Sequence, residues 1–131
     1  MSTVYVRSLY PLRVEAEGGL KVRVCGGMYE VKGQRRYYRG ETGVDLTDYV
    51  PQAGKRRVLV YLDVLWNKAK VEAAPATVGF PLYPPIPANG IALAYILLEA
   101  GDTSLRETDI EEARVLFEAN QGCDPLPCTG G

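Results

Sequence analysis

Two segments in the second half of the chain are apolar at almost every position, and they predict the centre of a β-sheet. In the segment Arg56–Leu65, apolar side chains occupy both alternating faces, and the segment Ile91–Glu99 repeats the pattern. A strand with one buried face alternates apolar and polar residues, whereas a strand covered on both faces reads as a nearly continuous apolar run. We therefore expect these two segments to be central strands with other structure packed against each face.

Shorter alternating segments fill the first half of the chain. Turn-forming pairs separate them, at Gly18-Gly19, Gly26-Gly27 and Gly33-Gln34. This pattern predicts a meander of short antiparallel strands. The segments expected to be strands are 4–6, 12–16, 20–24, 28–32 and 35–39.

Three connecting stretches have distinct compositions. Residues 41–51 read ETGVDLTDYVP and are expected to form a linker with local side-chain-to-backbone hydrogen bonds. Residues 66–68 predict the tip of a hairpin. Residues 74–90 are rich in proline, which has no N–H to donate to a strand ladder, so we expect a stiff, extended Pro-rich arm there.

The last part of the chain predicts one helix over residues 108–120. Thr108 and Glu111 have the spacing of a capping box, and the acidic residues of the first turn suit the helix dipole. Apolar residues then recur at helical spacing, and Gly122 is placed to end the helix. Residues 121–131 are expected to form a tail.

Together these elements predict the fold class. A length of 131 residues fits a single domain, 1–131, that can bury a core of its own. Residues 1–19 supply its N-terminal strands. We expect a mainly β fold, either a compact antiparallel β-sandwich or a partly open barrel, with one C-terminal helix.

The charge and hydropathy of the chain argue against two classes of partner, nucleic acids and membranes. A net charge of -1 gives no electrostatic footprint for nucleic acid or for an anionic membrane. The basic clusters at 32–39 and 55–57 are expected on solvated strand faces. No secretory signal pattern is present, and the longest apolar run, 91–98, is too short to span a bilayer. We expect a soluble protein that is made in the cytoplasm and binds neither nucleic acid nor membrane.

The sequence shows no recognisable set of catalytic residues. The sequence has no histidine, the commonest general base and metal ligand. Ser8 and Ser104 lie outside any G-x-S-x-G turn, and Cys25 likewise lacks a base that could activate it. No phosphate-binding loop follows a strand. We expect no enzymatic activity and no cofactor.

Metal and disulfide chemistry have few candidates. Glu41, Asp45 and Asp48 could line a cation site, but their spacing does not match a calcium loop and turn hydrogen bonds explain it better. Cys123 and Cys128 are close enough in sequence to close a small loop as a disulfide. Cys25 is expected to be a small buried apolar residue, and no metal site is expected.

Aromatic residues are the one ambiguous signal. An amphipathic ring can stack on a sugar, anchor a subunit interface, or simply pack in a strand. Core or interface use is favoured over ligand binding, and a glycan-stacking role is assigned to Trp66 and Tyr61 as the alternative. The expected protein-interface residues are Tyr83, Pro84, Pro85 and Ile86 on the arm, with Tyr37 and Tyr38 as secondary candidates.

An ordered set of short motifs resembles a module of tailed-bacteriophage virion proteins. The set comprises the V-Y-L-D tetrapeptide at 60–63, the polar hairpin at Asn67-Lys68, the Pro-rich crossing, P-A-N-G-I-A-L-A at 87–94, A-G-D-T-S-L at 100–105 and D-I-E-E-A-R at 109–114. Such modules occur in tail, baseplate, fibre and related appendage components. The resemblance implies a β-rich structural module that oligomerises, often as a trimer, and it carries no catalytic residues.

The functional expectation combines the resemblance with the residues. We expect a virion structural protein, a tail, fibre or appendage component, that acts through protein–protein contacts in a symmetric oligomer. Its partners would be further copies of itself and other virion proteins. Two alternatives stay open: a capsid decoration protein, and a receptor-recognition module that binds glycan on the host surface.

Overall fold

The computed structural model describes residues 6–114, and within them the chain is mainly β. Two single-turn 3-10 segments, η1 (Thr47–Tyr49) and η2 (Glu107–Asp109), interrupt the strands. The strands are β1 (Val6–Pro11), β2 (Val14–Gly18), β3 (Lys21–Val24), β4 (Gly27–Val31), β5 (Gln34–Tyr38), β6 (Glu41–Asp45), β7 (Lys55–Asp63), β8 (Lys68–Ala73), β9 (Gly90–Glu99) and β10 (Ile110–Glu112). The predicted mainly β class is therefore confirmed.

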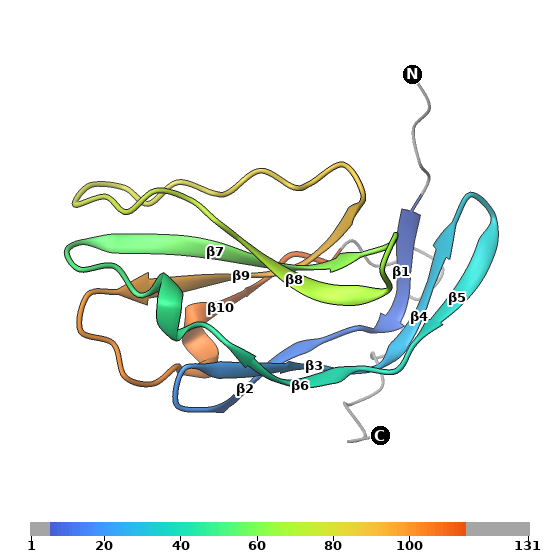
Figure 1. The fold of residues 1–131 in the computed structure, drawn as a ribbon, viewed down its shortest axis with the longest axis horizontal. Coiled ribbons are helices and arrows are strands. Elements are labelled where there is room, and N and C mark those ends of the chain that lie inside the picture. The colour runs from blue at the N-terminus through green and yellow to red at the C-terminus, as the bar shows by residue number, and fades with distance from the viewer. Residues whose placement is uncertain (1–5, 115–131) are drawn as a thin grey trace.

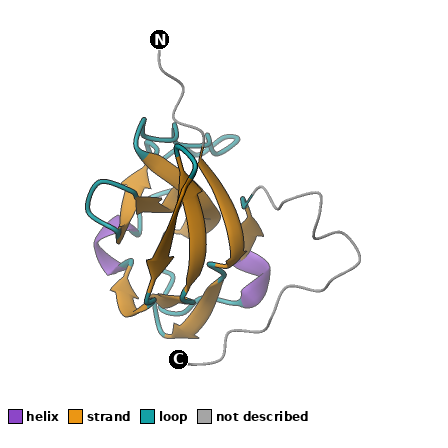
Figure 2. Cartoon of the chain, turned by 90° about the vertical axis from the view of Figure 1, so that its right-hand side faces the viewer, coloured by secondary structure: helices purple, strands orange, loops and turns teal. Residues whose placement is uncertain are grey.

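The described strands pair antiparallel in three sheets. Their orders are β10-β9-β7-β8, β2-β3-β6 and β1-β4-β5. In Figure 1 the four-stranded sheet lies opposite the β2-β3-β6 sheet, while the β1-β4-β5 sheet forms one end of the long axis. Figure 2, seen from that end, shows the strands surrounding a common interior with the 3-10 turns on opposite flanks. One core of buried Val, Leu, Ile and Tyr side chains joins the sheets.

The two apolar segments are central strands, as predicted. β7 lies between β8 and β9; it pairs with β9 along its whole length and with β8 from Val58 to Asp63. On its inner face, Val58, Val60 and Leu62 are fully buried in the core. On its outer face, Leu59 and Tyr61 are buried as well. A strand with two covered faces needs apolar residues at every position, which is the pattern this segment has.

The Gly-rich turns have different roles. Gly18-Gly19 closes the β2–β3 hairpin as predicted, and the β4–β5 turn lies at Lys32-Gly33, both in the left-handed region. Gly26, in contrast, does not close a hairpin. A Cβ there would lie 2.9 Å from the carbonyl oxygens of Tyr38 and Arg39, so glycine allows the chain to pass close to another segment as it leaves one sheet for the next.

Residues 41–45, predicted to begin a linker, form strand β6 instead. Val44 pairs with Val22 across the β3–β6 ladder, and the next apolar residue, Leu46, is fully buried. Free ladder positions on β3 and a nearby core outweigh the weak strand propensity of a segment that contains Gly and Asp. Only the part after β6, with η1, is a connection.

The helix predicted over 108–120 is wrong for the residues that the structure describes. Ile110 pairs with Ile96, and Glu112 pairs with Ala94, so this segment is an edge strand, β10. The Asp109 carboxylate accepts the Arg106 backbone N–H at 2.9 Å, in place of a cap from Thr108. The open edge of β9 satisfies the backbone while Ile110 packs on the core, and this tertiary contact overrides local propensity. Residues 115–131 lie outside the described part.

Candidate interaction surface

The Pro-rich arm lies over the outer face of the four-stranded sheet. Between β8 and β9 it runs along the length of that sheet (Figure 1). At its start, Thr77 and Lys55 exchange two backbone hydrogen bonds, of 2.8 and 2.9 Å. At its end, the Asn89 carbonyl accepts the N–H of Val64, just after β7, at 2.9 Å. The predicted extended crossing is thus fixed at both ends.

Arm side chains divide into an inward and an outward set. Pro81 and Pro84 are buried against the sheet. The outward set consists of large apolar side chains with nearly half or more of their surface in solvent, from 47% for Tyr83 to 91% for Val78. Its members are Val78, Phe80, Leu82, Tyr83 and Ile86. An uncovered apolar strip of this kind is characteristic of a surface that contacts another molecule.

One cation holds the middle of the arm. The Arg57 guanidinium, on β7, donates to the Pro81 carbonyl oxygen. Its central carbon also lies 4.1 Å from the centre of the Tyr83 ring and 5.6 Å from that of Phe80. A guanidinium in contact with a carbonyl and two aromatic rings fixes the path of the segment that carries them.

Tyr83 is held from its other side by two elements of the sheet. Its ring meets the Tyr95 ring edge-on, with centroids 4.8 Å apart. Its hydroxyl donates to both carboxylate oxygens of Glu111, on β10, at 2.9 and 3.1 Å. That hydrogen bond raises the pKa of Tyr83, because ionising the phenol would place two negative groups together. We call the Arg57–Tyr83–Glu111 contact the arm latch.

The predicted arm residues are only partly available to a partner. Tyr83 is half-exposed, while Pro85 and Ile86 are exposed. Pro84 faces the sheet and is buried. The sequence reasoning missed Val78, Phe80 and Leu82, although an apolar residue between prolines, where no helix or strand can bury it, is a usable signal.

The two secondary candidates separate, as expected of adjacent residues in a strand. Tyr37 points outward from β5 and is 65% exposed. Tyr38 is 1% exposed, and its hydroxyl donates to the Glu41 carboxylate. Burial and this acceptor raise the pKa of Tyr38. Tyr38 is therefore a core residue that a partner cannot reach, which corrects its assignment to an interface.

The glycan-stacking candidates do not form one platform. Trp66, in the β7–β8 turn, is 71% exposed, and the Lys70 ammonium lies 5.7 Å from the centre of its ring. Tyr61 is 8% exposed and packs beneath the arm against Gly90. Of these two candidates, Trp66 alone presents a face on which a sugar could stack.

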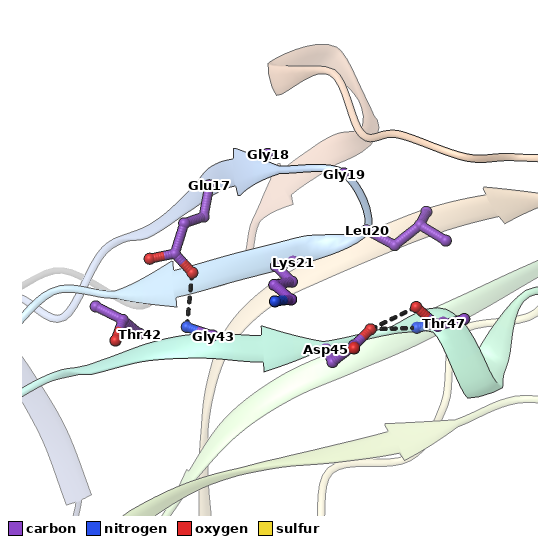
Figure 3. A pocket seen from close by; sticks show the side chains of 9 residues that line it. All are labelled: Glu17, Gly18, Gly19, Leu20, Lys21, Thr42, Gly43, Asp45 and Thr47. Carbon is purple, nitrogen blue, oxygen red and sulfur yellow. Dashed lines mark hydrogen bonds between the residues drawn. The ribbon is translucent and has the colours of Figure 1, made fainter.

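An open hollow of about 570 Å³ lies between the β2–β3 turn and β6 (Figure 3). Its carboxylates are already engaged by neighbouring groups. Glu17 accepts the Gly43 N–H at 2.6 Å, and Asp45 accepts both the N–H and the hydroxyl of Thr47. The two bonds from Thr47 lower the pKa of Asp45. The carboxylates of the hollow therefore accept hydrogen bonds from nearby backbone and hydroxyl groups, and they do not converge on one point as the ligands of a bound ion would.

The structure also bears on the metal and cysteine predictions. Glu41 accepts from the Tyr38 hydroxyl and the Ala69 N–H, and no group of three potential metal-binding side chains occurs within residues 6–114. Cys25 is buried as predicted but is disulfide-bonded, which corrects its assignment as a free apolar residue. The predicted Cys123–Cys128 pair lies outside the described residues.

No family model matches the chain, and it shows no significant similarity to a curated protein or to a solved structure. Within the described part of the chain, no helix has the length and apolar character needed to cross a membrane.

Proposed function

We propose that this protein is a bacteriophage virion structural component that assembles through protein–protein contacts of its Pro-rich arm. The main support is the apolar strip of the arm: its side chains are exposed, while the arm backbone is held to β7 by the hydrogen bond from Arg57 to Pro81. The resemblance of its motifs to virion modules supplies the biological setting. We infer a symmetric oligomer, a trimer by that resemblance, built from sandwich-like subunits in which the four-stranded sheet faces the β2-β3-β6 sheet.

The physical support is preorganisation. A loop that must become ordered on binding loses conformational entropy at each residue, and this loss weakens association. Here proline restricts the backbone. The two backbone hydrogen bonds between Thr77 and Lys55, together with the arm latch, hold the arm in place before any partner binds. The outward apolar residues therefore form a ready contact surface at little ordering cost.

Sedimentation velocity on purified protein tests the proposal. We expect the wild type to form a defined oligomer and the double variant Leu82→Ser/Ile86→Ser to dissociate, with a dissociation constant raised at least about tenfold. The matched control is Leu65→Ser/Trp66→Ser, which removes two apolar residues that are more exposed still, from the β7–β8 turn, and should leave assembly unchanged. A wild type that stays monomeric at high concentration would contradict the proposal.

Location on a particle requires a separate measurement. A cryo-EM map of a phage particle that contains the chain would show whether it sits in the tail, a fibre or an appendage, or decorates the capsid. If the chain occupied none of these positions, or were absent from purified particles, the proposed role in a virion would be wrong. The proposed assembly through the arm would not be affected.

Glycan recognition is the second candidate, and the exposed indole of Trp66 beside Lys70 favours it. An indole face stacks on a sugar ring, and an adjacent ammonium can donate to its hydroxyl groups. A glycan array with reproducible binding that is lost in Trp66→Ala would support this function, and an array without hits would remove it.

A further inference from the structure

Opposite charges gather at the two ends of the long axis of the molecule. The β4–β5 hairpin lies at one end, whereas the β2–β3 turn, η1 and the turn after β9 lie at the other (Figure 1). These segments are far apart in sequence, so their distribution of charge becomes visible only in the folded chain.

The hairpin end is basic. Its exposed cations are Lys32, Arg35, Arg36 and Arg39. Lys32 sits in the tight turn with φ of 50°, and Arg36 donates to the Val64 carbonyl at 2.9 Å. The other cations make no hydrogen bond or ion pair in the described part of the chain, while the nearby Glu30 already has a partner. We call this surface the basic end.

The opposite end is acidic. Its carboxylates are Glu17, Asp45, Asp48, Glu99 and Asp102, and within residues 6–114 none of them makes an ion pair. The cations there are fewer, namely Lys21, Lys55 and Arg56. Of these, Arg56 donates a hydrogen bond to the Tyr49 carbonyl oxygen at 3.0 Å. We call this surface the acidic end.

We propose that the basic end of one copy docks on the acidic end of a second copy, in a head-to-tail contact. The proposal rests on the proposed assembly function and adds a second, polar contact to the apolar contact of the arm. The occupant is a further copy of this chain because one chain carries both complementary surfaces. Head-to-head and tail-to-tail contacts would place like charges together and are disfavoured.

A head-to-tail contact joins two different patches, so it propagates until the copies close a ring or extend a filament. Exposed ion pairs are individually weak, and salt screens them. The contact should therefore form at low ionic strength and high concentration, and its strength should depend on several charges acting together.

A charge-swap experiment tests the contact, with self-association followed by analytical ultracentrifugation. It is performed in the Leu82→Ser/Ile86→Ser background so that the arm contact does not mask it. One variant carries Arg35→Glu and Arg39→Glu, and the other carries Asp48→Lys and Glu99→Lys. The first variant leaves two cations beside two new carboxylates at the basic end, which then carries no net charge, and the second variant makes both ends positive. Neither variant should therefore associate alone, whereas an equimolar mixture should form heterocomplexes between the unchanged acidic end of the first variant and the unchanged basic end of the second.

Salt and a matched control complete the design. Association of the background protein should weaken at least about tenfold between ~0.05 M and ~0.5 M NaCl, because the Debye length falls several-fold over this range. Glu72→Lys, a charge reversal on β8 away from both ends, should leave association unchanged. Far-UV circular dichroism confirms that every variant keeps its fold.

Four outcomes would overturn the proposal. Three of them are a background protein that does not associate at low salt, charge variants that associate as the background does, and a mixture that does not regain association. Loss of association in the basic-end variant alone would also overturn it, because a contact between copies needs both ends. In all these cases the arm-dependent oligomer of the otherwise wild-type protein can persist, so failure here is distinguishable from failure of the proposed function.

Discussion

The two faces of the four-stranded sheet are both covered, but by different means. The inner face packs Val, Leu and Ile side chains into a continuous core shared with the other sheets. The outer face is covered by the Pro-rich arm, which is held through the Arg57 guanidinium, the Tyr83 ring and the Glu111 carboxylate. The inner face can therefore supply most of the stability, while the arm on the outer face leaves an apolar strip exposed.

The largest effect is expected on the inner face. Leu62→Ala should lower the free energy of unfolding by about 3 kcal/mol, because Leu62 is fully buried and the close-packed core relaxes little around the cavity. Leu59→Ala on the outer face should cost about 2 kcal/mol, because the arm can settle into the space. Urea unfolding measures both, and equal losses would mean that the arm is as rigid as the core.

The next effect concerns the start of the arm. Gly54→Ala should destabilise by about 2 kcal/mol or more, because φ is 77° and the new Cβ would lie 2.3 Å from the Thr77 carbonyl oxygen. Gly33→Ala is the control, with φ of 80° and open space around it, and should cost about 1 kcal/mol. Thermal unfolding compares the pair; similar losses would show that the Thr77 segment yields easily.

A smaller effect is expected at the arm latch. Arg57→Gln removes the cation beside Tyr83 and the donor to the Pro81 carbonyl, and should cost about 1 kcal/mol. Its effect on self-association should be greater, since a loosened arm must be ordered again on binding. Arg57→Lys keeps the charge without the planar group, so its stability should lie between that of the wild type and that of Arg57→Gln. Hydrogen exchange of the arm amides reports the loosening, and unchanged exchange in Arg57→Gln would refute the latch.

The smallest effect is a dependence on pH at the end of the outer face. Asp63 accepts the Leu65 N–H and pairs with the Lys70 ammonium at 2.9 Å, and these contacts lower its pKa. A carboxylate with a lowered pKa contributes stability above its ordinary pKa and loses it as the pH falls through the folded value. Between about pH 5 and pH 3, the wild type should lose more stability than Asp63→Asn, by less than about 1 kcal/mol. Parallel pH curves would show that the pair contributes nothing.

The candidate surface could be predicted from sequence only in part. The many prolines of residues 74–90 predicted an extended arm, and the exposure of Ile86 and Tyr83 agreed with that interpretation. Strand alternation predicts that Tyr37 and Tyr38 lie on opposite faces of β5. It does not predict which of the two faces the core, because that depends on which face of β5 the rest of the protein covers. The arm latch could not be foreseen either, since it joins residues from three separate elements.

Local patterns determined where the strands run, because alternation and glycine turns act over a few neighbouring residues. They correctly placed β7, β9 and the β2–β3 hairpin. Tertiary structure decided what each segment pairs with: residues 110–112 have helical signals yet complete the edge of β9, and residues 41–45 read as a linker yet pair with β3. Free ladder positions and an adjacent core outweigh propensities of less than about 1 kcal/mol per residue, and they exist only once distant parts of the chain have met.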